Sequence, residues 1–181
     1  MYKFAAGSAT EQIVFGSARP GSTDRQVEQW IEFMHERDIQ RVCCLLSESQ
    51  LNRYADLLTI YRQNFGIDRI CWAPIDDFQL VDRQMLIHHI LPFLAIAVRS
   101  NEKVVIHCSG GVGRTGQILA AWLVAGRGYS CKSAIDTVIQ TGRNPYEAII
   151  AAPFLGRNPW QVLAEFNKLL DECVGLRNTF I

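Results

Sequence analysis

The segment from residue 104 to residue 116 reads VVIHCSGGVGRTG, and it constrains the fold more than any other stretch of the chain. Its first residues are β-branched and apolar, which favours a short buried strand. Glycines then favour a tight turn, and residues 116–125 are typical of a helix that ends near two further glycines. A strand that enters a helix through a glycine-rich turn is typical of an α/β domain.

Apolar runs and helical patterns alternate along the rest of the chain, which supports the same fold class. Pro92 is expected to kink or divide the helical segment in which it lies. The sequence therefore predicts a central, mostly parallel sheet flanked by helices, with an all-helical C-terminal segment. The strands are expected at 13–15, 41–46, 68–75 and 104–107, and the main helices at 27–36, 50–64, 81–99 and 116–125.

The length and the charge of the chain limit its organisation and its partners. A chain of 181 residues can bury a sizeable core in one domain but is short for two, and no linker divides it. We therefore expect a single domain over residues 1–181. The 18 basic residues balance the 18 acidic ones, whereas a general nucleic-acid-binding protein is expected to be basic. No nucleic-acid partner is predicted.

The sequence also shows no membrane segment and no metal-binding pattern. Residues 1–15 lack the apolar core of a signal peptide, and no apolar stretch approaches the roughly 20 residues of a membrane span. We therefore expect a cytoplasmic protein without a membrane partner. The six cysteines show no C-x-x-C spacing, and His88 and His89 have no ligand partner nearby in the sequence. No metal or other cofactor is predicted.

Cys108 and Arg114 enclose five small or apolar residues, an arrangement that suits a phosphate dianion. Successive backbone N–H groups and the start of a helix supply donors to such an anion. Arg114 can hold two phosphoryl oxygens with its planar guanidinium. The same positive environment favours the thiolate of Cys108, so one turn would bind the anion and activate the nucleophile. The enclosed residues are Ser109, Gly110, Gly111, Val112 and Gly113.

The sequence HCSGGVGRTG resembles the H-C-x5-R-[ST] signature of the cysteine-dependent protein tyrosine phosphatases. The nucleotide-binding pattern GxxxxGK[ST] is not matched, because no lysine lies in this segment. The resemblance extends upstream through residues 74–78 to residues 13–16 and covers most of the chain. The chain length and the lack of K-N-R-Y and W-P-D-x-x-x-P sequences favour the compact dual-specificity type. A dual-specificity phosphatase-like fold is therefore expected.

This resemblance implies a role for each residue of the signature. Cys108 would be the nucleophile that forms a phosphocysteine intermediate, and Arg114 would bind the phosphoryl group and stabilise the transition state. Backbone amides of residues 109–114 would complete the binding site. The Thr115 hydroxyl would hydrogen-bond the thiolate and assist hydrolysis, while His107 would orient the loop.

A carboxylic acid is expected near the signature, because the leaving oxygen needs a proton. The family pattern P-I-x-D falls on residues 74–77 and implies that Asp77 is this acid. Asp76 is its immediate neighbour and stays an alternative, since two adjacent acids can each raise the pKa of the other. A structural interpretation is also open, in which Asp77 ends a strand and caps a helix.

The substrate is less constrained than the chemistry. The loop carries no lysine of the kind that phosphoinositide phosphatases use, and it lacks the histidine and asparagine of RNA 5′-triphosphatases. Phosphotyrosine in proteins, with phosphoserine and phosphothreonine as further substrates, is therefore favoured. Two alternatives stay open: a catalytically weak module that binds phosphoproteins, and a phosphatase of a small phosphorylated metabolite or lipid. The sequence does not determine an oligomeric state.

Arg143 and Asn144 fall where related enzymes carry a loop that touches the substrate. Helix-capping roles are more typical of such residues, because the sequence G-R-N-P occurs twice, at 142–145 and 156–159. In the second copy, Asn158 is expected to cap a helix. Three tryptophans at helical spacing, Trp30, Trp122 and Trp160, are expected to pack in the core.

Overall fold

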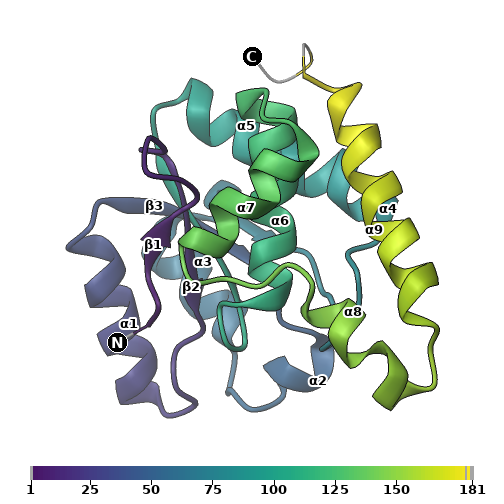
Figure 1. The fold of residues 1–181 in the computed structure, drawn as a ribbon. Coiled ribbons are helices and arrows are strands. Elements are labelled where there is room, and N and C mark those ends of the chain that lie inside the picture. The colour runs from purple at the N-terminus through teal and green to yellow at the C-terminus, as the bar shows by residue number, and fades with distance from the viewer. Residues whose placement is uncertain (1, 178, 180–181) are drawn as a thin grey trace.

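A five-stranded mixed sheet flanked by helices forms the centre of the protein, as a computed structural model of residues 2–177 and 179 shows (Figure 1). The strand order is β1-β2-β5-β3-β4, and only the β1–β2 pair is antiparallel. This confirms the predicted α/β fold. The two-residue strand β1 was not predicted, because so short a strand has no periodicity to detect. The strands are β1 Ala5–Ala6, β2 Val14–Ala18, β3 Ile39–Cys44, β4 Ile70–Trp72 and β5 Lys103–Cys108.

Strand β5 lies between β2 and β3, so its carboxyl end meets the ends of both neighbours. Cys108 is in register with Ala18 of β2, and His107 is in register with Cys44 of β3. Parallel strands place their carboxyl ends at one edge of the sheet, where ligands of α/β proteins bind. The segments that follow β2, β3 and β5 therefore leave the sheet beside Cys108.

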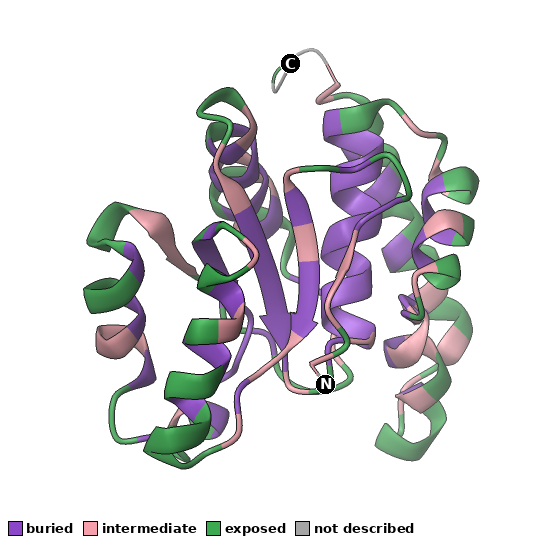
Figure 2. Cartoon of the chain, turned by 90° about the vertical axis from the view of Figure 1, so that its left-hand side faces the viewer, coloured by how far each residue is buried: buried purple, intermediate pink, exposed green. Residues whose placement is uncertain are grey.

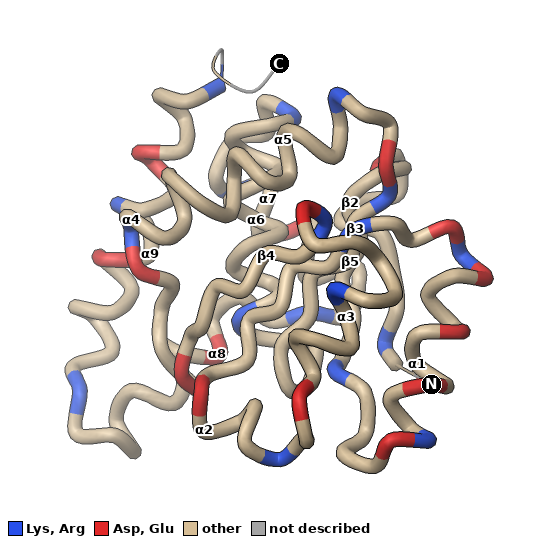
Figure 3. Tube along the Cα trace, turned by 180° about the vertical axis from the view of Figure 1, so that it is seen from behind, with Lys and Arg blue, Asp and Glu red and all other residues tan. Residues whose placement is uncertain are grey.

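The helices cover both faces of the sheet, and α6 is the most buried of them (Figure 2). Every residue of α6 from Gly113 to Gly126 is buried. Charged positions of both signs are interspersed along the trace (Figure 3). The helices are α1 Asp24–His35, α2 Glu48–Leu51, α3 Leu57–Phe65, α4 Arg83–Met85, α5 Leu91–Arg99, α6 Gly113–Arg127, α7 Cys131–Gln140, α8 Glu147–Ala151 and α9 Pro159–Val174. Shorter elements are η1 Ile67–Arg69, the π-helical turn η2 Leu86–Ile90 and η3 Ala152–Leu155.

Two predicted helices differ from the structure. The segment 50–64 forms α2 and α3 rather than one helix, because the Asp56 side chain accepts a hydrogen bond from Thr59 N at 3.1 Å and starts α3. The segment 81–99 is not one uniform α-helix, because the π-helical turn η2 separates α4 from α5 directly before Pro92. Pro92 lies in the first turn of α5, where its missing N–H group is tolerated. The C-terminal segment is helical, as predicted.

Two of the three tryptophans pack in the core as predicted. Trp30 and Trp122 are fully buried, on opposite faces of the sheet. The prediction for Trp160 was wrong, since 76% of this residue is exposed. Trp160 lies off the buried face of α9, which consists of Val162, Phe166, Leu169, Leu170 and Cys173. Within residues 2–177 and 179, no helix has both the length and the apolar character that a membrane crossing requires.

Candidate active site

Cys108 lies at the last position of β5, and the turn that follows it leads directly into α6. Cys108 is only 2% exposed. Gly111 in this turn has a φ of +69°, a conformation that glycine adopts without strain. A Cβ atom at Gly111 would come within 2.6 Å of the backbone of Ser17 and Ala18. The close packing of this turn against the end of β2 therefore requires glycine, and we call residues 108–114 the anion cradle.

The anion cradle presents the beginning of a long helix. Among the described residues, no side chain caps the N-terminus of α6, whose preceding residue is Val112. The first N–H groups of a helix have no partner within the helix, and together they attract an anion. The backbone N–H of Arg19 donates to the carbonyl oxygens of Cys108 at 2.9 Å and Ser109 at 3.3 Å. These bonds hold the cradle to the end of β2.

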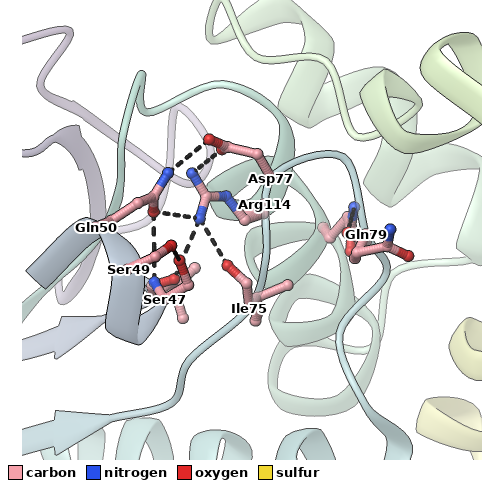
Figure 4. A network of polar contacts seen from close by, with 9 residues as sticks. Ser47, Ser49, Gln50, Ile75, Asp77, Gln79 and Arg114 are labelled. Atoms are coloured by element: carbon pink, nitrogen blue, oxygen red, sulfur yellow. Dashed lines mark hydrogen bonds and ion pairs between the residues drawn. The ribbon is translucent and has the colours of Figure 1, made fainter. Parts of the chain in front are cut away.

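Arg114 is almost completely buried, and its guanidinium bonds to groups in the segments that follow β3 and β4 (Figure 4). Nη1 donates to Ile75 O at 2.7 Å, to Gln50 Oε1 at 2.9 Å and more weakly to Leu45 O at 3.4 Å. Nη2 forms an ion pair with Asp77 Oδ1. The segments after β3 and β4 therefore converge on the guanidinium that ends the anion cradle.

Gln50 is a site residue that the sequence analysis missed. Its residue is 7% exposed, and its Nε2 donates to Asp77 Oδ2 at 2.5 Å (Figure 4). The Gln50 amide therefore bonds to both Arg114 and Asp77. The only sequence signal was the Ser47-x-x-Gln50 spacing of a capping box just after β3, which predicts a helix start rather than a site.

The two candidate acids occupy different positions. Asp77 reaches Arg114 and Gln50, while half of its side chain stays exposed to solvent. Among the described residues, the exposed Asp76 side chain forms no ion pair, and only its backbone carbonyl accepts a bond, from Gln79 N at 3.2 Å. The structure therefore brings Asp77 to the signature and leaves Asp76 outside. Neither residue caps a helix, since Asp82 caps α4.

His107 and Thr115 flank the anion cradle inside the core, and both are fully buried. His107 Nε2 lies 3.2 Å from the Tyr61 hydroxyl, and Trp30 packs edge-on against the imidazole. Burial lowers the pKa of His107 to about 3, although the backbone of Cys108 acts in the opposite direction. The imidazole is therefore neutral at physiological pH. Within the described part of the chain, Thr115 Oγ1 has no hydrogen-bond partner.

Arg143 is buried, and its guanidinium bonds to neighbouring parts of the chain. Its Nη1 donates to both oxygens of Thr141 at 3.1 Å, and its Nη2 donates to Lys3 O at 3.2 Å and Ala5 O at 3.3 Å. Burial lowers the pKa of Arg143 to about 10, and the charge of Cys108 acts in the opposite direction. The Arg143 side chain therefore holds the N-terminal segment to the loop after α7. Its backbone also helps to cap α7, in agreement with the expected capping role, because Gly142 N donates to Ile139 O at 2.9 Å and Arg143 N donates to Val138 O at 3.4 Å.

The two asparagines of the G-R-N-P repeats have different roles. Asn158 caps α9 as predicted, because its Oδ1 accepts a bond from Trp160 N at 2.9 Å. Asn144 accepts a bond from Tyr146 N at 3.1 Å, but α8 begins only at Glu147. The capping role expected for Asn144 was therefore wrong, and the residue forms a turn before the helix.

A family model described as "Polymorphic toxin system, DSP-PTPase phosphatase" matches residues 15–127. This range contains β2 except for its first residue, β3 to β5, the whole anion cradle, Gln50 and Asp77. The chain belongs to this phosphatase family. The resemblance inferred from the HCSGGVGRTG sequence is thereby confirmed.

Individual relatives agree with the family. A protein of Invertebrate iridescent virus 6, provisionally named tyrosine phosphatase 123R, is 25% identical over 81 residues, which are 45% of this chain. The match spans 56% of that relative, little more than half of its length. The crystal structure of Tk-PTP in its active form has 26% identity and a TM-score of 0.63, covering 86% of this chain and 92% of that one.

A more distant solved structure agrees in fold alone. PTPMT1 in complex with PI(5)P has 14% identity and a TM-score of 0.67, covering 93% of this chain and 97% of that one. Together with Tk-PTP, this likeness confirms the predicted dual-specificity phosphatase-like fold.

Proposed function

We propose that this chain hydrolyses phosphomonoesters through a covalent phosphocysteine intermediate. The observation that carries the proposal is the convergence, within residues 108–114, of a thiol, an uncapped helix N-terminus and a buried guanidinium. The Cys108 thiolate attacks phosphorus, an S–P bond forms, and the P–O bond to the leaving group breaks. A water molecule then attacks phosphorus, the S–P bond breaks, and phosphate and the thiolate are released.

The residues around Cys108 have different roles in these two steps. Arg114 and the backbone amides of residues 109–114 bind the phosphoryl oxygens and stabilise the charge of the transition state. The Thr115 hydroxyl, which has no other partner among the described residues, donates to the thiolate when it leaves phosphorus. His107 is a neutral positioning residue, held by Tyr61 at the end of β5.

Asp77 is the general acid of the proposed reaction. Its carboxyl protonates the leaving oxygen in the first step and takes a proton from the attacking water in the second. Its contacts with Arg114 and Gln50 support this assignment over Asp76, which has neither. Half of the Asp77 side chain is exposed, so a substrate can reach it from solvent.

Phosphotyrosine in proteins is the favoured substrate, with phosphoserine and phosphothreonine as further ones. An apolar groove of about 310 Å³ adjoins the site and is lined by Phe78, next to Asp77, and by residues of α8 and η3. Glu147 in the same groove lies against Gly113 of the cradle. Apolar walls suit an aromatic leaving group and its peptide neighbours better than they suit a highly charged inositol phosphate. The other lining residues are Ile150, Ala151, Phe154 and Leu155.

Hydrolysis of p-nitrophenyl phosphate without added metal tests this function. The wild type should turn over, and Cys108→Ser should lose roughly 10⁴-fold or more in kcat, because no other group replaces the nucleophile. A phosphotyrosine peptide and its phosphoserine counterpart then measure the substrate preference. Equal activity in wild type and Cys108→Ser would rule out the cysteine mechanism. A wild type that binds the phosphopeptide without turnover would support the binding-module alternative.

A further inference from the structure

We propose that Gln50 is a positioning residue of the proposed reaction, which keeps Asp77 beside the phosphoryl site while a substrate takes the place of the acid on Arg114. The inference rests on the proposed function. Its basis is one buried amide that accepts from Arg114 Nη1 at 2.9 Å and donates to Asp77 Oδ2 at 2.5 Å. Asp77 Oδ1 pairs with the other terminal nitrogen of Arg114, so the three side chains form a closed ring (Figure 4).

The closed ring has to open when a substrate binds. Nη1 of Arg114 is already occupied by Ile75 O, Gln50 Oε1 and Leu45 O. A phosphoryl group that takes two bonds from Arg114 must therefore use Nη2, where Asp77 now lies. The dianion displaces the carboxylate from Arg114, but the bond from Gln50 Nε2 to Oδ2 does not depend on that contact. Gln50 thus keeps the acid within reach of the leaving oxygen.

An amide fits this position better than a carboxylate or an apolar side chain. A glutamate would still accept from Arg114, but it would place a second carboxylate against Asp77, and like charges repel. A leucine of similar size would remove the acceptor of Arg114 Nη1 and the donor to Asp77 Oδ2, while the bonds of Arg114 to Ile75 O and Leu45 O would stay. Glutamine supplies one acceptor and one donor on a single planar group. The Gln50 amide is also oriented from behind, since Ser47 N lies 3.4 Å from Oε1 and the residue is 7% exposed.

Gln50→Leu, measured with phosphate esters of different leaving groups, tests this role. For an alkyl phosphate, whose leaving oxygen needs a proton, kcat should fall about tenfold or more. For p-nitrophenyl phosphate, whose leaving group needs little protonation, kcat should change much less. Gln63→Leu, at an exposed position of α3, is the matched control and should behave as wild type with both esters. Far-ultraviolet circular dichroism and the melting temperature show whether each variant folds.

The same substitution in an Asp77→Asn background separates the two partners of Gln50. If Gln50 acts by holding the acid, Gln50→Leu should cost little further alkyl phosphate activity once the acid is gone. An equal loss for both esters, undiminished in the Asp77→Asn background, would mean that Gln50 serves Arg114 alone and would overturn the proposal. Unchanged alkyl phosphate turnover would overturn it as well. Failure of the proposed function would instead appear in the wild type, as activity that does not depend on Cys108.

Discussion

The anion cradle and the two segments that bring Gln50 and Asp77 to it are built in opposite ways. We call these segments the acid arm; they are residues 45–50, which include the start of α2, and residues 73–79. The cradle is one continuous turn between a buried strand and a 15-residue helix, and both Cys108 and Arg114 are at most 3% exposed. The acid arm consists of the segments that follow β3 and β4, and its side chains bond to the cradle at Arg114. Half of the Asp77 side chain is exposed.

This difference matches what each group has to do. The nucleophile and the phosphoryl-binding groups must stay fixed, and regular secondary structure holds them within a packed core. The acid must release Arg114 when a substrate arrives and still find the leaving oxygen. A few polar bonds at a half-exposed position allow such an exchange, whereas burial within a helix would not. Substitutions in the cradle should therefore affect all substrates, and substitutions in the acid arm should affect those with poor leaving groups.

The largest effect that distinguishes the two regions is expected for Asp77→Asn. Loss of a general acid typically costs about 10²–10⁴-fold, so turnover of an alkyl phosphate should fall by that amount. Turnover of p-nitrophenyl phosphate should fall far less, and steady-state kinetics with both esters measures the contrast. Asp76→Asn is the matched control, because Asp76 carries the same charge one residue away but does not reach Arg114. A larger loss in Asp76→Asn than in Asp77→Asn would transfer the acid role to Asp76.

Arg114→Lys removes the guanidinium that connects the anion cradle to the acid arm. It should lower the turnover of both p-nitrophenyl phosphate and an alkyl phosphate. A lysine keeps the charge but cannot bond at once to Ile75 O, Gln50 and Asp77 or hold two phosphoryl oxygens. We expect kcat/KM to fall by roughly 10²–10³-fold for both esters, the usual cost of losing one transition-state donor. Competitive inhibition by inorganic phosphate should weaken in parallel. A loss confined to the alkyl phosphate would place Arg114 in the acid arm alone.

The same contrast explains what could be predicted from the sequence. The cradle is contiguous, so the residues from His107 to Thr115 stand together in HCSGGVGRTG and the site is visible as a motif. Asp77 was found only through the P-I-x-D pattern of related phosphatases. Gln50 was missed because its partners lie 27 and 64 residues away in the chain. A glutamine has no intrinsic sign of function until the fold supplies an acid and an arginine.

Prediction of the helices and strands from the sequence has a similar limit. Buried strands stand out as short apolar runs and long helices as periodic patterns, and these elements were predicted within a few residues. The break between α2 and α3 depends on a single cap at Asp56, which an apolar pattern running through it hides. The exposure of Trp160 depends on which face of α9 meets α6 and α8, and this is a tertiary property.

Gly111→Ala tests the rigidity of the cradle and should have the smallest effect of the series. The added methyl group would meet the backbone of Ser17 and Ala18 at 2.6 Å, and φ at this position is +69°. Backbone strain of this kind costs about 1–3 kcal/mol, which urea unfolding would measure as a lower free energy of unfolding.

Gly110→Ala is the matched control for stability, because a Cβ atom there would meet nothing within 4 Å. Its free energy of unfolding should stay within about 0.5 kcal/mol of wild type. Any activity that Gly111→Ala loses should be lost equally with p-nitrophenyl and alkyl phosphates, because the cradle serves every substrate alike. A stable Gly111→Ala enzyme with a selective defect on the alkyl phosphate would show that the cradle can move, and that the acid depends on this movement.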